Sequence, residues 1–309
     1  MGYHKTGTNW LQRVLFSERE SGLGWIGKRP RSHPIWRLVL ERPLEFDADD
    51  VRRSLDPLLE RARGGELTPV ISLERLSGHP FSGGHDARQI ADRLAAVVPE
   101  ARVLVVVREQ RSMIASTYKQ FVKAGGAQTF AHFVEPRGKQ NWRVPQFDFR
   151  HFEYHHLIRY YRSLFGADRV LVLPYEQLVG DPRAFVARIG DFAGRPLAAP
   201  LLDRLPYGRN LNPSPSALTV AALRRLNRFA PRNELNPAPI VELDAAERLA
   251  DWMKAGDVLS RGPAAGLAAR AEARLRSEVE QAVGTRYAAS NRETAELAGL
   301  DLASYRWPV

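Results

Sequence analysis

The chain has 309 residues, of which 44% are hydrophobic and 26% are charged, a composition typical of a globular protein with one large domain. It contains no cysteine, which excludes disulfide frameworks, thiolate zinc sites and cysteine nucleophiles. Its formal charge of +10 and its pI of about 10.1 favour anionic partners such as nucleotides, acidic glycans, nucleic acid or anionic lipid surfaces.

Apolar residues recur at helical spacing in some segments and form short unbroken runs in others. The run RVLVVV at 102–107 is the strongest strand signal, and its continuity is typical of a parallel strand covered on both faces. Pro30, Pro34 and Pro43 favour a loop over 27–46. In chain order, helices are predicted over 10–20, 47–63, 86–98, 111–123, 148–165 and 181–192, and strands over 69–74, 102–107 and 170–173.

This alternation of strands and helices predicts an α/β fold in which a parallel sheet is flanked by helices. The strand signals end near residue 196, and helices are then predicted over 214–230, 244–260 and 264–298. We therefore expect a single domain over 1–309, with an α/β core at 1–195 and a mainly helical C-terminal part at 196–309.

The first residues of the chain form a glycine-containing loop. Residues 2–9 read GYHKTGTN, with Gly2 and Gly7 at the G-x-x-x-x-G spacing of loops that turn backbone amides toward a phosphate. An NTPase would continue with lysine and then a serine or threonine that holds magnesium, but here Thr8 and Asn9 occupy those places and the lysine is Lys5. Compared with an NTPase loop, this loop keeps the backbone amides that bind an anion but lacks the usual magnesium ligand. We therefore expect no metal.

The segment KTGTNW at 5–10 resembles the 5′-phosphosulfate loop of sulfotransferases, whose pattern is roughly K-[ST]-G-T-[ST]-W. The single departure is Asn9, whose amide can still donate a hydrogen bond. The resemblance implies a P-loop NTPase-like fold and 3′-phosphoadenosine 5′-phosphosulfate (PAPS) as the donor co-substrate. It assigns the 5′ end of the donor to Lys5, Thr6, Gly7, Thr8, Asn9 and Trp10.

A second motif follows the strand predicted to end at residue 107. Arg108 comes next, and Ser116 stands eight residues later on the next predicted helix. Arg108 therefore emerges at the carboxyl end of a parallel strand, where α/β sheets bind ligands, and a guanidinium can hold a phosphate through two hydrogen bonds. In sulfotransferases an arginine and a serine at this spacing bind the 3′-phosphate of the donor, although the Asn-Pro that often follows the arginine is absent here. Arg111 is a further candidate.

Two further stretches resemble bacterial members of this family. They are the strand at 170–173 with the YEQLVGDP after it, and the RYAASNR at 286–292. The glycine-rich C-terminal loop with which eukaryotic cytosolic members also hold the 3′-phosphate is not visible. Arg286, Ser290 and Asn291 are candidates to replace it, while Ser290 and Asn291 suit a helix cap equally well.

Sulfuryl transfer needs a base for the acceptor and a cation for the leaving oxygen. Lys5 is the expected cation because of its place in the loop. Glu74, after the second strand, is favoured as the base, since glycan- and tyrosine-modifying sulfotransferases resemble this arrangement. His79 and His85 are the alternatives, because a histidine is the base in cytosolic small-molecule members. An ion pair with Arg75 or another arginine is the structural alternative for Glu74.

The remaining histidines receive structural roles. His4 adjoins the lysine of the loop and is expected to support it. His151 and His155 stand four residues apart on a predicted helix, as metal-binding pairs do, and His156 follows them. No acidic third ligand stands at a matching spacing, so we interpret them as an ordinary helix face.

These observations predict a cytoplasmic, bacterial sulfotransferase, since no apolar run approaches a membrane span and a polar loop stands where a signal peptide would be apolar. It is expected to move a sulfuryl group from PAPS to a hydroxyl or amine of an acceptor. The aromatic helix at 149–165 and the positive charge suit a carbohydrate or acidic glycan, and also a lipid headgroup. The alternatives are a nucleotide kinase or NTPase with a degenerate loop, and a non-enzymatic polyanion-binding protein. No nucleic-acid partner is expected, and the oligomeric state is open.

A phosphate loop normally follows a buried strand, but only Met1 precedes Gly2. We expect that the first strand is truncated in this sequence and that the true start lies upstream of Met1. Translating the upstream DNA in frame tests this expectation.

Overall fold

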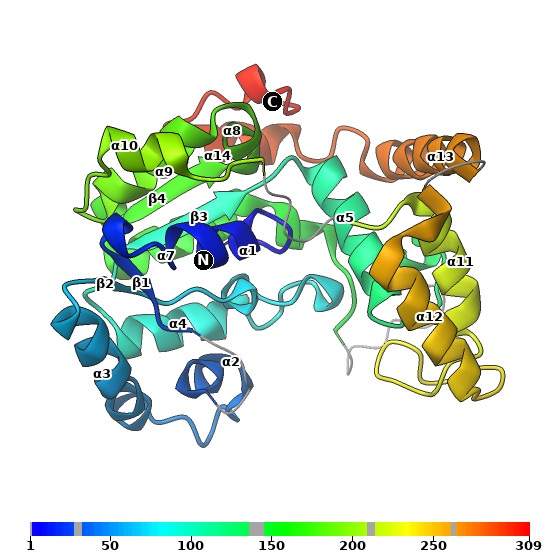
Figure 1. Cartoon of the computed structure of the whole chain (residues 1–309), viewed down its shortest axis with the longest axis horizontal. Helices are drawn as coiled ribbons and strands as arrows, with labels where there is room; N and C mark the ends of the chain where they lie inside the picture. The colour runs from blue at the N-terminus through cyan, green and yellow to red at the C-terminus, as the bar shows by residue number, and fades with distance from the viewer. Residues whose placement is uncertain (1, 28–32, 136–144, 209–213, 261–263) are drawn as a thin grey trace.

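Short parallel strands form the centre of the fold. The computed structural model describes residues 2–27, 33–135, 145–208, 214–260 and 264–309 (Figure 1). In these residues β1 (Leu23–Trp25) pairs with β2 (Thr68–Val70), and β3 (Val103–Val107) pairs with β4 (Val170–Pro174), both in parallel. The predicted α/β class is confirmed, with the difference that the described strands form two pairs rather than one sheet.

The first pair differs most from the prediction. β1 has only three residues, with Gly24 in the middle, and is too short to give a periodic signal. β2 ends at Val70, and the chain from Glu74 to Ser77 forms a 3-10 helix instead of completing the predicted strand at 69–74. Pro69 lies within β2 and has no amide hydrogen for the ladder, which favours a short strand.

β3 carries side chains into two separate cores. Val105 and Val107 belong to the larger apolar cluster, whereas Val106 belongs to the smaller one. Because successive residues of a strand point to opposite faces, packed side chains cover β3 on both faces. This is the arrangement that its unbroken apolar run predicts.

Acidic side chains cap three helices of the α/β core. Asp47 and Asp181 cap α3 and α9 by accepting the amide three residues further on, at 2.9 and 3.0 Å. The Glu109 carboxylate accepts the amides of Arg111 and Ser112 at 3.0 and 2.9 Å and so caps α5. The helices close to their predicted ranges are α3 (Ala48–Gly64), α4 (Ala87–Val97), α5 (Gln110–Lys123), α7 (Tyr154–Phe165) and α9 (Pro182–Phe192).

Shorter helices fill the connections. The helix predicted over 10–20 is shorter and mixed in type, because α1 (Thr8–Trp10) continues as a π-helical turn at Leu11–Leu15. The other short helices are α2 (Arg37–Leu40), within the predicted loop, and α6 (Phe130–Val134), α8 (Tyr175–Gly180) and α10 (Ala199–Arg204).

The C-terminal part is helical, as expected, and packs on the α/β core. α11 (Ala217–Asn227) and α13 (Ala265–Val283) contact α5, α12 (Asp244–Gly256) contacts α11, and α14 (Ala288–Ala298) contacts α7 (Figure 1). The single helix predicted over 264–298 is broken, because Gly284 ends α13 with a φ of +53°. Within the described residues, no helix combines the length and the apolar character that spanning a membrane requires.

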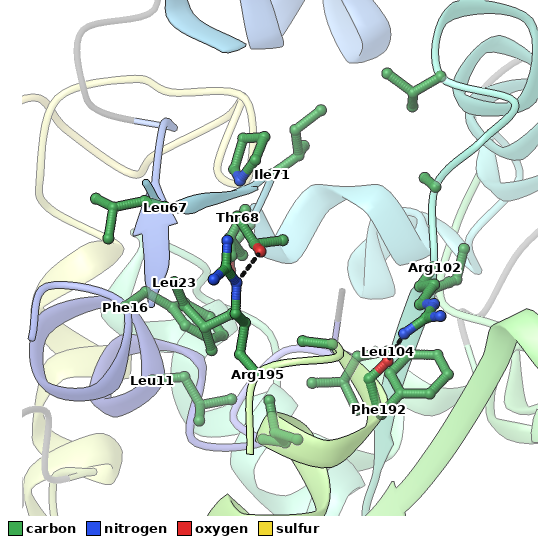
Figure 2. A pocket seen from close by; sticks show the side chains of 18 of the residues that line it. Leu11, Phe16, Leu23, Leu67, Thr68, Ile71, Arg102, Leu104, Phe192 and Arg195 are labelled. Atoms are coloured by element: carbon green, nitrogen blue, oxygen red, sulfur yellow. Dashed lines mark hydrogen bonds between the residues drawn. The ribbon is translucent and has the colours of Figure 1, made fainter. Parts of the chain in front are cut away.

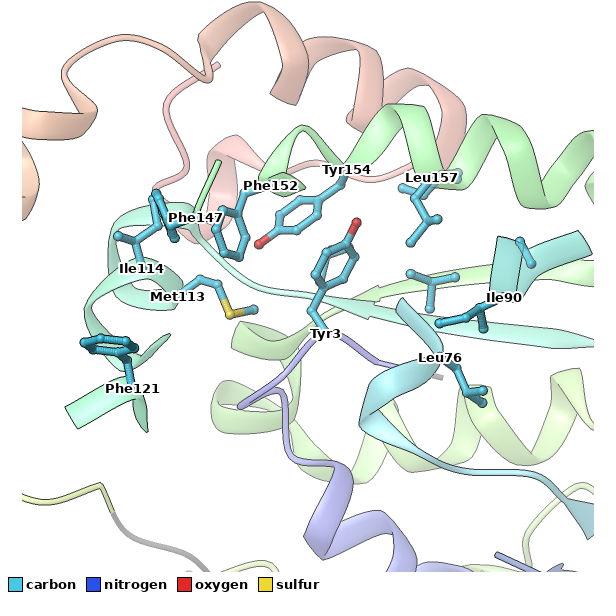
Figure 3. Packing of buried hydrophobic residues seen from close by; sticks show 14 of the residues in the cluster. Tyr3, Leu76, Ile90, Met113, Ile114, Phe121, Phe147, Phe152, Tyr154 and Leu157 are labelled. Atoms are coloured by element: carbon cyan, nitrogen blue, oxygen red, sulfur yellow. The ribbon is translucent and has the colours of Figure 1, made fainter. Parts of the chain in front are cut away.

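The larger core joins the first residues of the chain to the last. The Tyr3 ring is 2% exposed and packs edge-on against Tyr154, at a centroid distance of 4.7 Å (Figure 3). Tyr154 in turn contacts the Trp307 ring at 5.9 Å. Most rings of the aromatic segment 149–165 are buried in this core, so they cannot stack on a sugar and their interpretation as an acceptor platform is wrong. The buried rings are Phe149, Phe152, Tyr154, Tyr161 and Phe165.

Candidate active site

The loop at residues 2–9 leaves the edge of β3 and turns sharply. Gly2 forms a parallel bridge with Val106, and the amide of Tyr3 donates to the Val106 carbonyl oxygen at 3.1 Å. Two residues of the loop then adopt left-handed backbone, Lys5 with a φ of 66° and Gly7 with a φ of 81°. Such a path turns several amides of a short segment in one direction, which is how backbone loops bind anions.

The hydroxyl side chains of the loop face inward. Thr6 is fully buried, and its Oγ1 donates to the carbonyl oxygen three residues earlier at 2.6 Å. Thr8 is 4% exposed, and the indole nitrogen of Trp10 donates to the backbone of the segment after α10 at 3.2 Å. These three residues therefore shape the loop. The loop groups that remain for a ligand are the backbone amides and the half-buried side chains of Lys5 and Asn9.

Lys5 lies within a group of cations. Its pKa is lowered, mainly because the side chain is partly buried and then because Lys123 repels its charge. The charge of Glu74 raises the pKa of Lys5, whereas the charges of Arg108 and Lys119 lower it further. Cations that repel one another attract an anion, which relieves the repulsion, so the surroundings of Lys5 favour a phosphate or a sulfate.

Arg108, the first residue after β3, is held by four contacts. Its Nη1 donates to the carbonyl oxygen of Lys5 at 3.1 Å, and its Nε donates to Ser112 Oγ at 3.1 Å. The guanidinium lies over the Tyr175 ring at 4.9 Å, and the Tyr154 hydroxyl donates to the Arg108 carbonyl oxygen at 2.6 Å. The structure thus joins Arg108 to the loop and fixes its orientation.

A cavity of about 520 Å³ opens beside Arg108, between α5 and α13. Ser116 lies on its wall, so the two residues predicted for the 3′-phosphate share one space, while loop residues 5–10 do not line it. Among the described residues that line this cavity, Ser116 Oγ, Arg111 Nε and Glu176 Oε2 are buried without a hydrogen-bond partner. Buried polar atoms are normally paired, so the hydroxyl and the guanidinium nitrogen suit a bound anion, whereas the Glu176 oxygen does not.

Other charged residues of this cavity come from distant parts of the chain. Lys119 lies on α5, Arg276 lies on α13, and Arg306 follows the last 3-10 turn with a φ of 63°. Lys119 Nζ pairs with Glu272 at 2.7 Å. No sequence motif marks Arg276 or Arg306, because only the packing of the C-terminal part brings them here. The acids on the wall are Glu109, Glu176, Glu272 and Glu280, so the cavity has mixed charge.

Glu74, the favoured base, lies near the loop lysine. It is the first residue of the 3-10 helix that follows β2, and it is half-buried. Its charge acts on Lys5 and raises the pKa of that side chain. Arg75, the anticipated ion-pair partner of Glu74, pairs with Asp86 at 2.6 Å. The predicted cation and the predicted base therefore interact electrostatically.

The alternative bases are less suited to the role. His79 Nδ1 accepts the amide of Phe81 at 3.2 Å, which assigns the ring proton to Nε2, and burial is the main cause that lowers the His79 pKa to about 4. A ring in this tautomer donates from Nε2 and cannot take a proton there. His85 is exposed, and the ring centroid of His4 lies 5.8 Å from that of His79.

The histidines near α7 do not form one face. His151 belongs to the 3-10 turn before α7 and is 9% exposed, whereas His155 Nδ1 shares a hydrogen bond with Ser290 Oγ at 2.9 Å. One ligand atom each from Glu153, His155 and His156 lie within 4.8 Å of one another. An acid therefore does accompany two of these histidines, and the expectation that none does is wrong.

The C-terminal candidates have other partners. Gln110 Nε2 donates to Asn291 Oδ1 at 2.6 Å, Ser290 is engaged with α7, and the Arg286 guanidinium lies over the Phe149 ring at 4.5 Å. None of the three lines the cavity beside Arg108. From this part of the chain, the cations that do line it are Arg276 and Arg306.

Comparison with known proteins finds similarity to sulfotransferases. The crystal structure of a sulfotransferase from Alicyclobacillus acidocaldarius is similar, with 19% identity, a TM-score of 0.47, and coverage of 80% of this chain and 97% of that chain. No curated protein matches the sequence significantly. Residues 87–199, which include Arg108 and Ser116, match the family model described as the sulfotransferase family. Residues 87–199 of this chain are therefore similar to the sulfotransferase family, whose members are transferases of a sulfuryl group.

Proposed function

We propose that the protein transfers the sulfuryl group of PAPS to a hydroxyl or amine of an acceptor. The contacts of Arg108 carry the proposal, because its guanidinium bonds the backbone of Lys5 and also borders the cavity that holds Ser116. Two anion sites joined by one guanidinium suit a ligand with an anionic group on each side of a ribose, as PAPS has.

The residues divide between the two ends of the donor. Backbone amides of the loop, with Lys5 and Asn9, would hold the 5′-phosphosulfate, and Thr6, Thr8 and Trp10 would keep the loop in shape. Arg108 and Ser116 would hold the 3′-phosphate, with Arg111 beside them. Arg276 and Arg306 extend the positive wall of this second site.

The transfer itself is a displacement at sulfur. The acceptor oxygen or nitrogen bonds to sulfur while the bond from sulfur to the 5′-phosphate oxygen breaks, so that adenosine 3′,5′-bisphosphate leaves. Lys5 stabilises the negative charge that grows on the leaving oxygen. Glu74 accepts the proton that the acceptor loses. No step is assigned to a metal ion.

The acceptor is proposed only as a hydroxyl or amine. The burial of the aromatic rings at 149–165 removes the argument from stacking on a sugar. An acidic carbohydrate keeps one observation in its favour, the formal charge of +10, because a basic protein attracts anionic substrates.

Calorimetry with adenosine 3′,5′-bisphosphate tests the donor assignment. Wild type is expected to bind, and Arg108→Ala to lose roughly tenfold or more in affinity, because hydrogen bonds to charged groups contribute about 1.5–3 kcal/mol. Adenosine 5′-monophosphate, which lacks the 3′-phosphate, is expected to bind both proteins weakly and equally. Arg150→Ala is the control, since Arg150 is exposed and paired with Asp148 at 2.6 Å.

Three outcomes would overturn this assignment. One is no binding by wild type. Magnesium-dependent binding of ATP would support a nucleotide kinase instead. Salt-sensitive binding of DNA without affinity for the nucleotide would support a polyanion-binding protein.

A further inference from the structure

Two histidines and two glutamates gather where α14 packs on α7 (Figure 1). Glu153 is the N-cap residue of α7, His155 and His156 lie in the first turn of this helix, and Glu293 lies on α14. Counting one ligand atom from each, Glu153, His155 and His156 have these atoms within 4.8 Å of one another. These four residues, which come from two helices, form the α7–α14 cluster.

The α7–α14 cluster is separate from both cavities. None of its four residues lines the cavity beside Arg108. None lines a second cavity, of about 570 Å³, whose wall includes Thr68 and Leu104 (Figure 2). No step of the proposed transfer uses them, so the cluster is not part of the donor site.

The distances in the cluster match the edges of a tetrahedral zinc site. His156 Nε2 lies 3.2 Å from Glu153 Oε2, and His155 Nε2 lies 3.7 Å from Glu293 Oε2. Zinc bonds to imidazole and carboxylate are about 2.0–2.2 Å long, so two ligand atoms of a tetrahedral site lie roughly 3.3–3.6 Å apart. The ring centroids of His155 and His156 are 3.9 Å apart, which brings the two pairs together. Small side-chain rotations would therefore place all four atoms around one ion.

His155 is oriented in the way that metal-binding histidines usually are. It is 5% exposed, and its Nδ1 shares a hydrogen bond of 2.9 Å with Ser290 Oγ on α14. When Nδ1 donates in this bond, Nε2 keeps its lone pair for a metal. A hydrogen bond at the second ring nitrogen is the common device that fixes the tautomer and the direction of such a ligand.

The charges of the cluster favour a cation. The start of α7 carries the positive end of the helix dipole, which disfavours a cation, but Glu153 and Glu293 supply two negative charges that offset it. Arg159 Nη2 now pairs with Glu293 at 2.7 Å and would compete with a metal for this carboxylate. Imidazole nitrogens with carboxylate oxygens suit zinc, whereas magnesium and calcium prefer oxygen ligands alone.

We propose that the α7–α14 cluster binds one zinc ion, through a nitrogen of each histidine and an oxygen of each glutamate. Zinc takes such nitrogen and oxygen ligands in four-coordinate sites. The ion would join the start of α7 to α14 and so fasten the C-terminal part to the α/β core. It would stabilise this packing and take no part in the transfer.

Calorimetry with zinc chloride, on the whole protein after treatment with a chelator, tests the proposal. Wild type is expected to bind one equivalent. Ser290→Ala removes only the orienting bond and should lose roughly tenfold in affinity, and His156→Gln, which removes a ligand, should lose roughly a hundredfold or more. The His156 side chain is 62% exposed, so its substitution leaves the fold intact. The control is His85→Gln, an exposed histidine outside the cluster, which should bind as wild type does.

Arg159 provides a change in the opposite direction. Arg159→Ala releases the Glu293 carboxylate, so the affinity for zinc should rise about two- to fivefold, the usual worth of an exposed ion pair. Glu293→Gln should lower the affinity. Zinc that binds to unrelated surface histidines would respond to neither substitution.

Thermal unfolding gives a second measurement. Zinc at a hundredfold excess over its dissociation constant should raise the unfolding midpoint of wild type by roughly 5 °C, because the ion binds only the folded chain. The midpoint of His156→Gln should not change at the same zinc concentration.

Three results would overturn the proposal. One is no zinc binding by wild type, and another is binding that His156→Gln and Glu153→Gln leave intact. An equal loss of affinity in His85→Gln would show that zinc binds histidines of the chain without selection. The affinity for adenosine 3′,5′-bisphosphate should be the same in His156→Gln as in wild type, so these results are independent of the test of the donor site.

Discussion

Arg108 Nη1 donates a hydrogen bond to the carbonyl oxygen of Lys5 at 3.1 Å, which ties the end of β3 to the phosphate loop. Both side chains are cations, and the charge of Arg108 lowers the pKa of Lys5. The backbone bond therefore holds together two groups that would otherwise repel each other. An anion beside them is attracted by both, so the bond sets the spacing at which two anionic groups of one ligand can be bound.

Ser116→Ala removes a hydroxyl that has no partner among the described residues. We expect the free energy of unfolding to stay the same or to rise by up to about 1 kcal/mol, because a buried unsatisfied group is removed. The affinity for adenosine 3′,5′-bisphosphate should fall about tenfold or more, because one hydrogen bond to a charged group contributes about 1.5–3 kcal/mol. Chemical denaturation and calorimetry measure the two quantities.

Thr117→Ala is the matched control for this change. Thr117 Oγ1 is also buried without a partner, but Thr117 does not line the cavity beside Arg108. Its substitution should therefore leave the affinity unchanged. An equal loss of affinity in both variants would remove Ser116 from the 3′-phosphate site.

Glu74→Gln keeps the shape of the proposed base and removes its ability to take a proton. The turnover rate with radiolabelled PAPS and a panel of hydroxyl and amine acceptors should fall about a hundredfold or more, which is the usual contribution of a general base. The affinity for adenosine 3′,5′-bisphosphate should change little. His79→Gln is the comparison, and if its turnover falls further than that of Glu74→Gln, the histidine is the base.

The sequence predicts that Arg108 and Ser116 lie close together, because they stand on consecutive elements. Arg108 and Ser116 meet in one cavity because the end of a parallel strand and the next helix are neighbours in every α/β fold. Arg276 and Arg306 could not be predicted, since their approach depends on the packing of α13 and the last residues against α5. The role of the aromatic segment at 149–165 was misjudged because periodicity shows which residues are apolar but not whether they bind a ligand or fill a core.

The strands also divide into those that the sequence predicts and one that it does not. The long apolar runs of β3 and β4 identify them without ambiguity, because only a strand buried on both faces needs such a run. β1 was not predicted, because its three residues around Gly24 are too few to show the alternation of apolar and polar residues that marks a strand. Its strand conformation comes from pairing with β2, a contact between residues more than forty positions apart.

Gly7→Ala should damage the loop for two separate reasons. Gly7 has a φ of 81°, which other residues rarely adopt, and an added Cβ would lie 2.5 Å from Leu178 Cδ2. We expect a loss of about 1–3 kcal/mol in the free energy of unfolding and a weaker affinity for adenosine 3′,5′-bisphosphate. Adding Leu178→Ala to Gly7→Ala should restore only the part of the lost unfolding free energy that is due to this clash.

Gly64→Ala provides the control for this loss. Gly64 ends α3, and an added Cβ there would meet nothing within 4 Å. Its substitution should leave stability unchanged or raise it slightly, because alanine loses less entropy on folding. If Gly7→Ala is as well tolerated as Gly64→Ala in urea denaturation, the left-handed turn is not needed for the loop.

His151 should make the protein less stable as the pH falls below neutrality. Burial is the main cause that lowers its pKa from 6.5 to about 4, with Asp86 and Asp148 opposing and His79 adding to the effect. Between these two values the unfolded chain binds more protons than the folded one. The stability due to the neutral ring is therefore complete above the unfolded pKa and is lost progressively as the pH falls through this window, by about 3 kcal/mol in total.

Urea denaturation at several pH values between about 4 and 7.5 measures this dependence. His151→Asn should be less stable than wild type at neutral pH, since a buried ring is lost, but its stability should decline less steeply with acid. The exposed His85 is the control, and His85→Asn should keep the wild-type slope. Parallel curves for wild type and His151→Asn would mean that the His151 ring is protonated with little cost in the folded protein, and that the acid sensitivity arises at other groups.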